Sequence, residues 1–584
     1  MRPLLISLLA ALLAASPIPA GAQGAPPGAP TPGSQAILSD AARTLPVLAP
    51  HGMVVSQEAG ATRVGVEVLE RGGNAVDAAV AVGFALAVTL PRAGNLGGGG
   101  FMLVHRADRG ETAAIDHRET APAAATPGMF LGEDGEPDPA RSRRSGLSVG
   151  VPGTVRGLAL ALERFGSGRF TLADLIGPAE RLAREGIPVE DDLADSLPRA
   201  AGLLGRYPST RAVFFEGDRP IARGGRLVQP DLARTLDAIA RGGPDAFYKG
   251  PIAERIAAAV REAGGIMRAE DLADYRAVLR EPVRGSYRGH TILSMPPPSS
   301  GGVHLVQILN ILEGFDLAAM GAGSADLLHV LTEAMKPAYA DRATWLGDPD
   351  RVAVPVRGLT SKAYAAALRA AIDLAHARPA ATIAAGDPLP HESDQTTHYS
   401  VADRDGNVVS ATTTLNFSYG VGLVAEGTGV LLNNEMDDFA AKVGAANAFG
   451  LVGGARNLPA PGARPLSSMS PTLVLRDGRP LLVTGTPGGS RIISTTLQVI
   501  VNSLDLGLNL AEAVAAPRIH HQWRPDYLLA ETGLSPDTLR LLAERGHRVV
   551  VGSSSGSASS IMAVPGAWAG AADPRQRGTL AAGH

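Results

Sequence analysis

The sequence DQTTHYSVADRDGNVVSATTTLN, residues 394–416, decides how the fold of this chain is read. Two runs rich in β-branched residues, at 397–403 and 408–414, flank the turn RDGN at 404–407. Short β-branched runs that are separated by an Asp-Gly turn are typical of a β-hairpin. The stretch therefore predicts two neighbouring antiparallel strands, with a pair of threonines where the first strand begins.

The sequence before this hairpin reads as mostly helical, and the sequence after it reads as mostly strands. Helices are expected at residues 74–90, 154–165, 172–185, 251–263, 303–312, 325–341 and 490–504. Further strands are expected at 429–432, 471–476 and 481–485, and a second Asp-Gly turn at 476–479 predicts another hairpin. On the helix at 325–341, we expect His329, Glu333 and Lys336 to share a face that is partly exposed to solvent and partly packed against the protein. Sheets flanked by helices favour one α/β layered body over separate domains.

The apolar segment at 74–90 belongs either to the core or to a membrane. It is rich in alanine, contains Asp77 and stops before Pro91, and Asn74 is a suitable N-cap. A helix that is apolar all round but shorter than the ~20 residues of a membrane span is typical of a large core. The segment therefore predicts a buried core helix.

The N-terminus has the pattern of an export signal. Arg2 is followed by an apolar run and by the small residues AGA, which end at Ala22. This pattern predicts a signal peptide at 1–22 and a periplasmic or secreted protein without a membrane anchor. The Pro-, Gly- and Ala-rich sequence that follows predicts a flexible leader at 23–50.

Composition excludes some classes of function. The 584 residues carry a net charge of −4, and no run of Lys and Arg provides the basic face that a nucleic acid requires. The chain has no cysteine, so an exported form has no disulfides and depends on a large buried core. The absence of thiols also directs the search for a covalent nucleophile to hydroxyl groups.

Three motifs have a catalytic form but the wrong context. The glycine-rich run at 94–100 lacks the end of a phosphate loop and the spacing of a dinucleotide site, so we expect a close backbone crossing. Residues 552–556 match the G-x-S-x-G pattern, but an extended segment follows where a nucleophile elbow requires a helix. The pairs 391–392 and 520–521 contain histidines without metal-site spacing, which favours structural histidines and no metal.

Thr396 offers a hydroxyl with a route to activation. A threonine is a weak nucleophile unless a base lies next to it, but an N-terminal threonine can use its own α-amine, with a pKa of about 7.7–8.0. Because Thr396 lies in mid-chain, this chemistry requires cleavage of the bond between Gln395 and Thr396. The local pattern alone favours a threonine-rich edge strand without a catalytic role.

Other motifs change that balance. The chain contains TTHY at 396–399, NNEMDDF at 433–439, RPLSSMSP at 464–471 and GTPGGSR at 485–491. The glycine-rich run, DHRE at 116–119 and ADPR at 572–575 complete the pattern. In this order, from about residue 52 to residue 583, the motifs closely resemble the γ-glutamyltransferases (glutathione hydrolases), a family of N-terminal-nucleophile enzymes.

The resemblance implies a precursor that cuts itself before Thr396. It implies a large subunit at 51–395 and a small catalytic subunit at 396–584, which together form a four-layer αββα sandwich. The Thr396 hydroxyl is expected to attack the carbonyl of Gln395, and water is expected to open the resulting ester and leave a free amine. Thr414 matches the family position that contacts and supports the nucleophile.

The resemblance also implies how a γ-glutamyl donor is held. Arg118 is expected to hold the donor α-carboxylate through paired hydrogen bonds, with the hydroxyls of Ser467 and Ser468 assisting. The positions that match those holding the α-ammonium are Asn416, Glu435 and Asp438. The backbone N–H groups of Gly488 and Gly489 match the oxyanion hole.

Residues 440–464 resemble the lid loop of the family. Where the family usually has an aromatic hydroxyl, this chain has Phe449, whose ring can cover the pocket but cannot form that hydrogen bond. His117, at a position that varies within the family, is interpreted as structural. The implied donors are glutathione and other γ-glutamyl compounds, the implied acceptors are water, an amino acid or a peptide, and no cofactor is implied.

Two other functions stay open at this point, as does the choice between hydrolysis and transfer. A cephalosporin or glutaryl acylase shares the nucleophile and fold, but a glutaryl group has no α-amine to pair with Glu435 and Asp438. A non-catalytic exported binding protein is the second alternative. It would stay one chain, and the complete set of catalytic positions argues against it.

Overall fold

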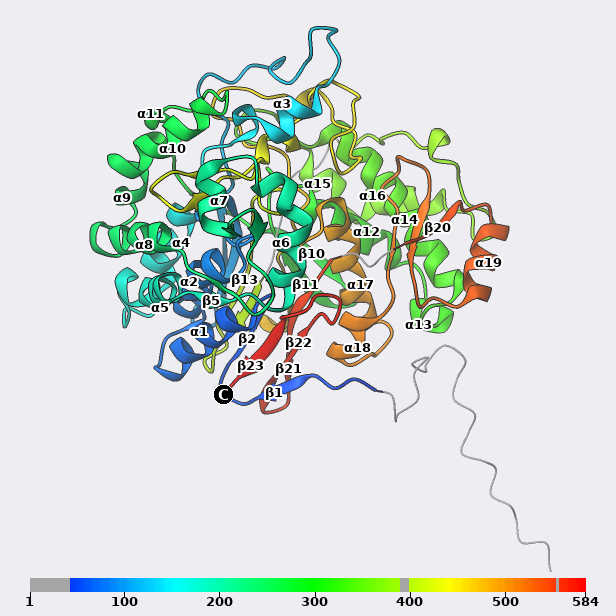
Figure 1. Ribbon diagram of the computed structural model, residues 1–584. Coiled ribbons are helices and arrows are strands. Elements are labelled where there is room, and N and C mark those ends of the chain that lie inside the picture. The colour runs from blue at the N-terminus through cyan, green and yellow to red at the C-terminus, as the bar shows by residue number, and fades with distance from the viewer. Residues whose placement is uncertain (1–42, 389–398, 553–555) are drawn as a thin grey trace, which may run out of the picture.

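Two β-sheets form the centre of the molecule, and helices cover both outer sides (Figure 1). The computed structural model describes residues 43–388, 399–552 and 556–584. The first sheet runs in the order β1 (Val47–Ala49), β22 (Ala567–Ala572), β21 (Ser559–Val564), β17 (Arg479–Thr484), β16 (Thr472–Arg476), β11 (His290–Ser294) and β10 (Val283–Tyr287). The second sheet runs in the order β23 (Leu580–Gly583), β2 (Met53–Ser56), β12 (Tyr399–Ala402), β13 (Val408–Thr414), β3 (Gly99–Arg106), β4 (Glu111–His117) and β9 (Val278–Arg280). Neighbouring strands are antiparallel in both sheets.

The outer layers are helical. The layer over the second sheet contains α1 (Ala59–Glu70), α2 (Ala75–Thr89), α4 (Thr154–Phe165), α5 (Leu172–Glu185) and α8 (Pro230–Gly242). The layer over the first sheet contains α12 (Gly301–Leu312), α14 (Ala325–Trp345), α17 (Ile492–Leu504) and α18 (Leu510–Ala515). Figure 1 shows the first group on the left of the strands and the second group on the right. Because a third apolar cluster fills the space between the two sheets, the molecule is the expected αββα sandwich.

Shorter elements surround these layers. The other helices are α3 (Pro139–Arg144), α6 (Asp191–Leu204), α7 (Pro208–Phe214), α9 (Asp245–Tyr248), α10 (Pro251–Glu262), α11 (Ala269–Asp274), α13 (Leu317–Met320), α15 (Val356–Leu359), α16 (Lys362–Ala370) and α19 (Pro536–Glu544). The 3-10 helices are η2 (Gly146–Ser148), η3 (Ala380–Thr382), η4 (Glu435–Asp438), η5 (Ala455–Asn457) and η6 (Gly489–Arg491). Small sheets pair β5 (Ile187–Pro188) with β8 (Arg226–Leu227), β6 (Phe215–Glu216) with β7 (Arg219–Pro220), β14 (Val424–Ala425) with β15 (Val430–Leu431), and β19 (Leu528–Glu531) with both β18 (Ile519–His520) and β20 (Val549–Gly552).

The hairpin predicted at 394–416 is confirmed. Strand β12 pairs with β13, with Tyr399 opposite Ala411, and β13 pairs on its other side with β3, with Thr414 opposite Gly99. Both strands are therefore internal, so the prediction of an edge strand from the local pattern is wrong. The second predicted hairpin forms between β16 and β17. The first two residues of the predicted first strand lie outside the described residues.

The predicted helices agree with the structure to within a few residues. Helices α4 and α5 have the predicted bounds. Helix α14 continues beyond its predicted end to Trp345. The helix predicted at 490–504 begins as the 3-10 turn η6 before α17.

Each sheet combines strands that precede position 396 in the sequence with strands that follow it. In the second sheet, β12 and β13 follow that position in the chain and lie between β2 and β3, which precede it. In the first sheet, β16 and β17 lie between β11, which precedes it, and β21, which follows it. Because both segments supply strands to both sheets, a chain cut at this position would still be one folded body.

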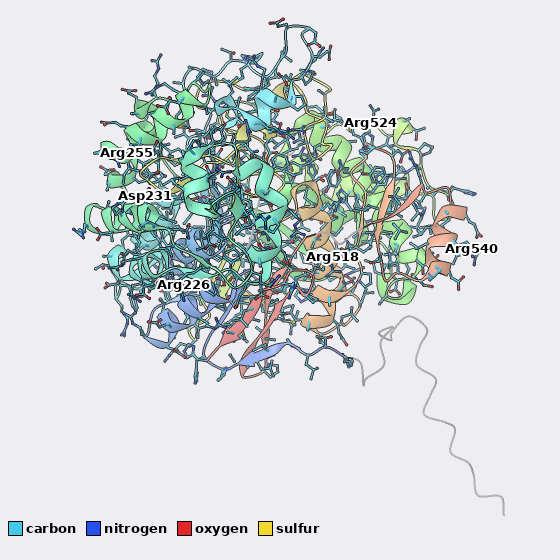
Figure 2. All side chains as sticks on the ribbon, in the orientation of Figure 1. Arg226, Asp231, Arg255, Arg518, Arg524 and Arg540 are labelled. Atoms are coloured by element: carbon cyan, nitrogen blue, oxygen red, sulfur yellow. The ribbon has the colours of Figure 1, made fainter. Side chains whose placement is uncertain are left out.

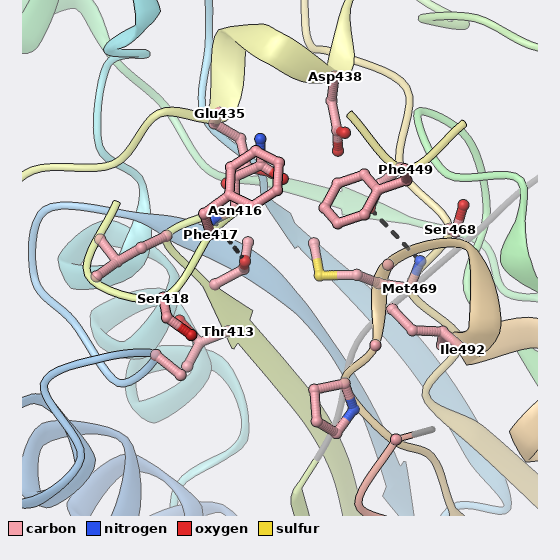
Figure 3. A pocket seen from close by; sticks show the side chains of 18 of the residues that line it. Thr413, Asn416, Phe417, Ser418, Glu435, Asp438, Phe449, Ser468, Met469 and Ile492 are labelled. Atoms are coloured by element: carbon pink, nitrogen blue, oxygen red, sulfur yellow. Dashed lines mark hydrogen bonds between the residues drawn. The ribbon is translucent and has the colours of Figure 1, made fainter. Parts of the chain in front are cut away.

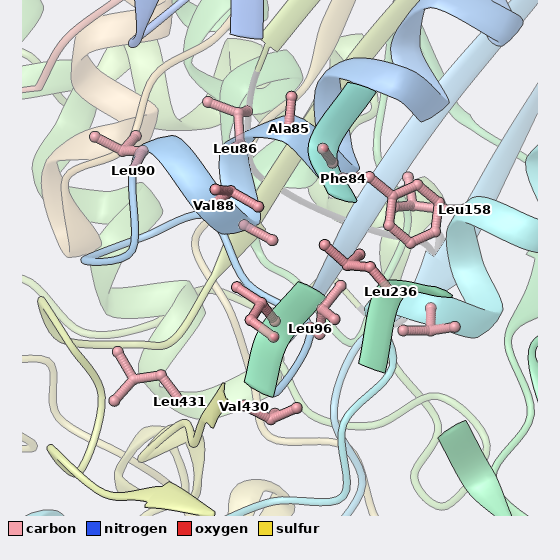
Figure 4. Packing of buried hydrophobic residues seen from close by; sticks show 14 of the residues in the cluster. Phe84, Ala85, Leu86, Val88, Leu90, Leu96, Leu158, Leu236, Val430 and Leu431 are labelled. Atoms are coloured by element: carbon pink, nitrogen blue, oxygen red, sulfur yellow. The ribbon is translucent and has the colours of Figure 1, made fainter. Parts of the chain in front are cut away.

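Helix α2 is the buried core helix that its sequence predicted. All of its residues are buried. Asn74 accepts hydrogen bonds from the N–H groups of Val76 and Asp77, and the Asp77 carboxylate accepts one from the Asn74 N–H at 2.9 Å. Figure 4 shows apolar side chains of this helix and its neighbours: Phe84, Leu86, Leu96, Leu158 and Leu236. Within the part of the chain that the structure describes, no helix is long and apolar enough to cross a membrane.

The glycine-rich run at 94–100 is a close backbone crossing, as predicted. A Cβ on Gly98 would lie 2.0 Å from the carbonyl oxygen of Thr414, so only glycine fits there. Asn95 donates its Nδ2 hydrogen to the same carbonyl oxygen at 2.8 Å. The run thus holds the end of β13 in place.

One prediction for α14 is wrong. His329, Glu333 and Lys336 are all buried, whereas we expected a face partly in solvent. The Lys336 Nζ donates to the Glu333 carboxylate at 2.6 Å, and His329 Nδ1 lies 2.7 Å from Nε2 of His547, which follows α19. These polar groups form hydrogen bonds with one another inside the protein. Their spacing along the helix is the same as that of polar residues on an exposed face, which is why the sequence suggested exposure.

Candidate active site

A cavity of about 370 Å³ opens at the end of β13, next to η4 and η6. Eight residues predicted for the site line it together: Thr414, Asn416, Glu435, Asp438, Ser467, Ser468, Gly488 and Gly489. Figure 3 shows the carboxyl groups of Glu435 and Asp438 along one edge and the rings of Phe417 and Phe449 facing each other. The structure thus brings together segments that are far apart in the sequence. Gln395 and Thr396 lie outside the described residues.

The end of β13 supplies two hydrogen-bonding groups to the cavity. The Thr414 hydroxyl accepts a hydrogen bond from the Asn416 N–H at 2.8 Å. Asn416 has a φ of +73°, a conformation that asparagine tolerates better than most residues, and its Nδ2 donates to the Asn434 carbonyl oxygen at 3.0 Å. This bond directs the Asn416 amide and leaves its Oδ1 to accept a hydrogen bond from a ligand.

Gly488 and Gly489 form a tight turn before α17. Their φ values are +138° and +57°, which favour glycine. A Cβ on Gly489 would lie 2.5 Å from the Phe449 ring, so the space between this turn and the ring is also suited to glycine alone. Backbone N–H groups at such a turn, just before a helix N-terminus, can stabilise an oxygen that becomes negatively charged.

Arg118 lies behind the cavity wall and is fully buried. Its Nη1 contacts the Glu435 carboxylate, its Nη2 donates to Asp438 Oδ2 at 2.7 Å, and its Nε donates to the Pro465 carbonyl oxygen at 3.1 Å. Glu119 is also buried, with one carboxylate oxygen 3.8 Å from Arg118 Nη1. The guanidinium predicted to hold a substrate carboxylate is therefore paired with protein carboxylates in this structure.

The ionisation of this cluster is perturbed by burial. Burial alone lowers the pKa of Arg118, but the charges of Glu435, Asp438 and Glu119 outweigh it and raise that pKa. Burial raises the pKa of Glu119 to about 7 and that of Glu435 well above its ordinary value, although Arg118 opposes both shifts. Burial likewise raises the pKa of Asp438. One guanidinium thus stands against three carboxyl groups whose pKa values burial raises.

Arg342 is a site residue that our sequence reasoning missed. From α14, its Nη2 donates to Ser468 Oγ at 3.1 Å and its Nε donates to Ser300 Oγ at 2.8 Å. Ser300 in turn donates both its N–H and its hydroxyl to the Ser467 carbonyl oxygen, each at 2.8 Å. Because a guanidinium cannot accept a hydrogen bond, the Ser468 hydroxyl hydrogen is free to point into the cavity. Burial lowers the pKa of Arg342 to about 10, so the residue stays charged at neutral pH.

The segment predicted as a lid, 440–464, contributes Phe449 and Leu451 to the cavity lining. The Phe449 ring stacks on Phe417, with ring centres 4.9 Å apart. Its carbonyl oxygen accepts a hydrogen bond from Gln522 Nε2 at 3.0 Å. Packing and a backbone hydrogen bond therefore hold Phe449 over the glycine turn without a ring hydroxyl.

Other predicted residues are structural or lie elsewhere. His117 is buried, and burial lowers its pKa to about 4, so it stays neutral in the core as expected. His520 Nδ1 lies 2.8 Å from Ser494 Oγ, which is also a structural contact. Residues 559–564, after the G-x-S-x-G pattern, form strand β21, so the helix of a nucleophile elbow is absent there. In the described ranges, no cluster of three histidines or carboxylates is arranged to hold a metal ion.

The comparisons with known proteins agree with this geometry. The sequence model of the family "Gamma-glutamyltranspeptidase" matches residues 61–583. The glutathione hydrolase proenzyme of Escherichia coli (strain K12) is 54% identical over 578 residues, which cover 99% of this chain and 98% of that protein. The crystal structure of cephalosporin acylase from Bacillus halodurans has a TM-score of 0.82 at 28% identity and covers 96% of this chain and 99% of its own. Helicobacter pylori gamma-glutamyltranspeptidase has a TM-score of 0.57 at 45% identity and covers 60% of this chain and 98% of its own. The chain belongs to the gamma-glutamyltranspeptidase family.

Proposed function

We propose that this chain hydrolyses or transfers the γ-glutamyl group of glutathione and other γ-glutamyl compounds. The observation that carries the proposal is the chemical division of the cavity. One part presents the carboxyl groups of Glu435 and Asp438. Another part presents the hydroxyls of Ser467 and Ser468, with the Arg342 guanidinium behind Ser468. A γ-glutamyl group carries an α-ammonium and an α-carboxylate on one carbon, so it complements both parts at once.

Donor binding rearranges the buried ion pair between Arg118 and Asp438. The donor inserts its α-carboxylate against Arg118 and its α-ammonium against Asp438, which replaces one ion pair by two. Asp438 is the accessible member, since its side chain is 12% exposed whereas that of Arg118 is fully buried. Asn416 Oδ1 and Glu435 complete the ammonium site, and the arriving cation opposes the effect of burial on the pKa of the carboxyl groups.

Cleavage of the precursor generates the nucleophile. The Thr396 hydroxyl oxygen attacks the Gln395 carbonyl carbon, the peptide C–N bond breaks, and an ester to Thr396 forms. Water hydrolyses this ester, which gives a large subunit that ends at Gln395 and comprises the leader and residues 51–395, and a small subunit at 396–584 with a free N-terminal amine. The Thr414 hydroxyl supports the nucleophile, because the chain enters β12 at Tyr399 beside β13, which ends at Thr414.

Turnover uses the same groups. The Thr396 amine takes the proton of its own hydroxyl, and the oxygen attacks the γ-carbonyl carbon of the donor. The N–H groups of Gly488 and Gly489 stabilise the oxyanion that forms. The proton then passes to the leaving amine as the amide bond breaks, and water or the amine of an acceptor opens the γ-glutamyl ester.

The glutaryl acylase alternative fits the cavity less well. The similarity to a cephalosporin acylase structure shows that this fold also occurs in acylases. A glutaryl group would bring no cation to Glu435 and Asp438, and burying a charge without a partner is costly. The acidic part of the cavity therefore favours γ-glutamyl donors. We further propose that residues 1–22 direct the enzyme out of the cytoplasm.

The mass of the purified protein tests the proposal. The wild type should consist of two chains, the smaller beginning Thr-Thr-His-Tyr, and should hydrolyse γ-glutamyl-p-nitroanilide. Thr396→Ala should remain a single chain without activity. Thr397→Ala is the matched control, because it removes the neighbouring hydroxyl and should still be cleaved. An active wild type that remains a single chain would refute the mechanism.

A further inference from the structure

A second cavity, of about 970 Å³, lies beside the active-site cavity. We call it the arginine groove, because Arg141, Arg143 and Arg144 of α3 line it together with Arg206, which follows α6. An Arg206 Nη2 hydrogen bond to the Arg144 carbonyl oxygen, 2.9 Å long, joins the two sides. Figure 1 shows α3 above α6, at the top of the molecule.

The charge of this groove is largely uncompensated. Arg143 pairs with Asp437 at 3.1 Å. Among the residues that the structure describes, no carboxylate pairs with Arg141, Arg144 or Arg206, and no acidic side chain lines the groove. Guanidinium groups that converge on a concave surface without counterions attract carboxylates, with which they form paired hydrogen bonds.

The groove shares a wall with the active-site cavity. The Phe417 side chain lines both. On the active-site side it stacks on Phe449 (Figure 3). Ala448, the residue before Phe449, lines the groove. Asn434 also lines the groove, and its carbonyl oxygen holds the Asn416 amide. The two cavities are therefore neighbours across Phe417.

Another cavity next to the active-site cavity has a different charge balance. A cavity of about 610 Å³ shares Arg92, Ser418 and Gln576 with the active-site cavity. Four arginines line it: Arg92, Arg199, Arg575 and Arg577. Arg92 pairs with Asp192 at 2.5 Å, Arg575 pairs with Glu531 and Asp573, and Arg577 lies 3.7 Å from Asp195. Among the described residues, Arg199 is the one arginine of this cavity without a carboxylate partner, so the cavity offers less attraction to an anion than the arginine groove.

We propose that the arginine groove binds the carboxylate of the peptide on the far side of the scissile bond. That peptide is the leaving group of a γ-glutamyl peptide donor or the peptide that accepts the γ-glutamyl group, and in both cases a free C-terminal carboxylate extends away from Thr396. The inference rests on the proposed function, which places the γ-glutamyl group itself in the inner cavity. Arg144 and Arg206, for which the described part of the chain offers no carboxylate partner, are the principal contacts.

Two donors that differ in one carboxylate test the leaving-group site. These are γ-glutamyl-p-nitroanilide and γ-glutamyl-3-carboxy-4-nitroanilide, compared in the wild type and in the double variant Arg144→Gln/Arg206→Gln. The kcat/KM for the carboxylated donor should fall about 5- to 20-fold in the variant, while that for the neutral donor stays within about twofold. High salt should reduce the wild-type preference, because partly exposed charges are screened.

A control variant separates the groove from the net charge of the protein. Arg255→Gln/Arg540→Gln also removes two positive charges, at exposed positions remote from α3, as Figure 2 shows for both residues. This variant should keep the wild-type preference for the carboxylated donor.

A second experiment, the acceptor arm, compares glycylglycine with glycylglycinamide as acceptors of the γ-glutamyl group. Loss of preference in the donor arm identifies the leaving group as the ligand, and loss in the acceptor arm identifies the acceptor.

The test separates failure of this inference from failure of the proposed function. Wild-type turnover of the neutral donor tests the function alone. If the wild type turns over the neutral donor and the groove variant keeps the wild-type preference in both arms, the groove does not bind the carboxylate. Equal losses for carboxylated and neutral compounds would likewise overturn the inference.

Discussion

Two buried arginine clusters in this molecule differ in their charge balance. Arg518 lies in the interior and donates to Asp573 Oδ2 at 2.6 Å, and Arg575 donates to Glu531 Oε2 at 2.6 Å and to Asp573 Oδ1 at 3.1 Å. Two guanidinium groups there face two carboxylates. At the active site, the Arg118 guanidinium faces three carboxyl groups, and the nearby Arg342 donates its hydrogen bonds to serine hydroxyls.

The difference shows which cluster is complete without a ligand. The balanced cluster also bonds to backbone carbonyl groups around α18, as when Arg575 Nη2 donates to the Ala516 carbonyl oxygen at 2.7 Å, so it ties the chain terminus to the core. In the unbalanced cluster, burial raises the pKa of all three carboxyl groups although Arg118 opposes each shift, so one guanidinium does not balance their charge. We interpret the first cluster as structural and the second as a site that an ammonium group completes.

Removing the central cation of the balanced cluster should have the largest effect. Arg518→Gln leaves Asp573 with a weaker partner inside the protein, and breaking a buried pair costs about 3–5 kcal/mol of folding stability. Urea unfolding of the variant should show this loss. Arg545→Gln, which removes a partly exposed partner of Asp326, is the control and should change stability by less than about 1 kcal/mol. Equal stability of the two variants would show that the Arg518 cluster is not structural.

At the unbalanced cluster, the expected effect is on substrate rather than on folding. Arg118→Lys keeps the charge but loses the paired hydrogen bonds, a loss of about 1.5–3 kcal/mol, or roughly 10- to 150-fold in kcat/KM for γ-glutamyl-p-nitroanilide. Self-cleavage should continue, because the Gln395 carbonyl brings no free carboxylate. The control is Arg280→Lys, because the Arg280 guanidinium pairs with Asp116 and Asp350 outside the cavity. This variant should keep the kinetics and the subunit ratio of the wild type. Normal kinetics in a mature Arg118→Lys enzyme would contradict the carboxylate role.

A smaller effect is expected on the pH dependence of stability. Burial raises the pKa of Glu119 from 4.5 to about 7, so the folded protein holds a proton that the unfolded chain releases. The resulting stabilisation is complete below pH 4.5 and is lost as the pH rises through about 7. Glu119→Gln removes this ionisation. The decrease in unfolding free energy between pH 5 and pH 8 should therefore be smaller in the variant than in the wild type, by on the order of 1–2 kcal/mol. An unchanged slope would show that Glu119 is ionised throughout.

Much of the fold could be predicted from local patterns. The Asp-Gly turns, the Asn74 cap and the alternating strands each act over a few residues, so the hairpins and helix bounds followed from the sequence. The burial of His329 and Lys336 could not be predicted in this way, because their partners, such as His547, come from distant segments. Internal polar pairs and exposed faces have the same spacing along a helix.

The site was predicted in part for a related reason. Eight residues that the resemblance identified do converge on the cavity. The pairing of Arg118 with Asp438 depends on a contact between positions 320 residues apart, which no local pattern shows. Arg342 had no comparable local signal, because α14 also carries Glu333, Lys336 and Asp341, and only the fold places Arg342 beside Ser468.

The central claim is that the cavity binds the two charges of the donor with different residues. Three donors separate these charges: γ-glutamyl-p-nitroanilide, the 4-aminobutyryl anilide without the carboxylate, and the glutaryl anilide without the ammonium. The measurement is kcat/KM for each donor in the wild type, Asp438→Asn and Arg342→Gln. Asp438→Asn should impair the two donors that carry an ammonium and spare the glutaryl donor, and Arg342→Gln should impair the two that carry a carboxylate and spare the 4-aminobutyryl donor. Equal losses for all three donors in both variants would contradict the claim.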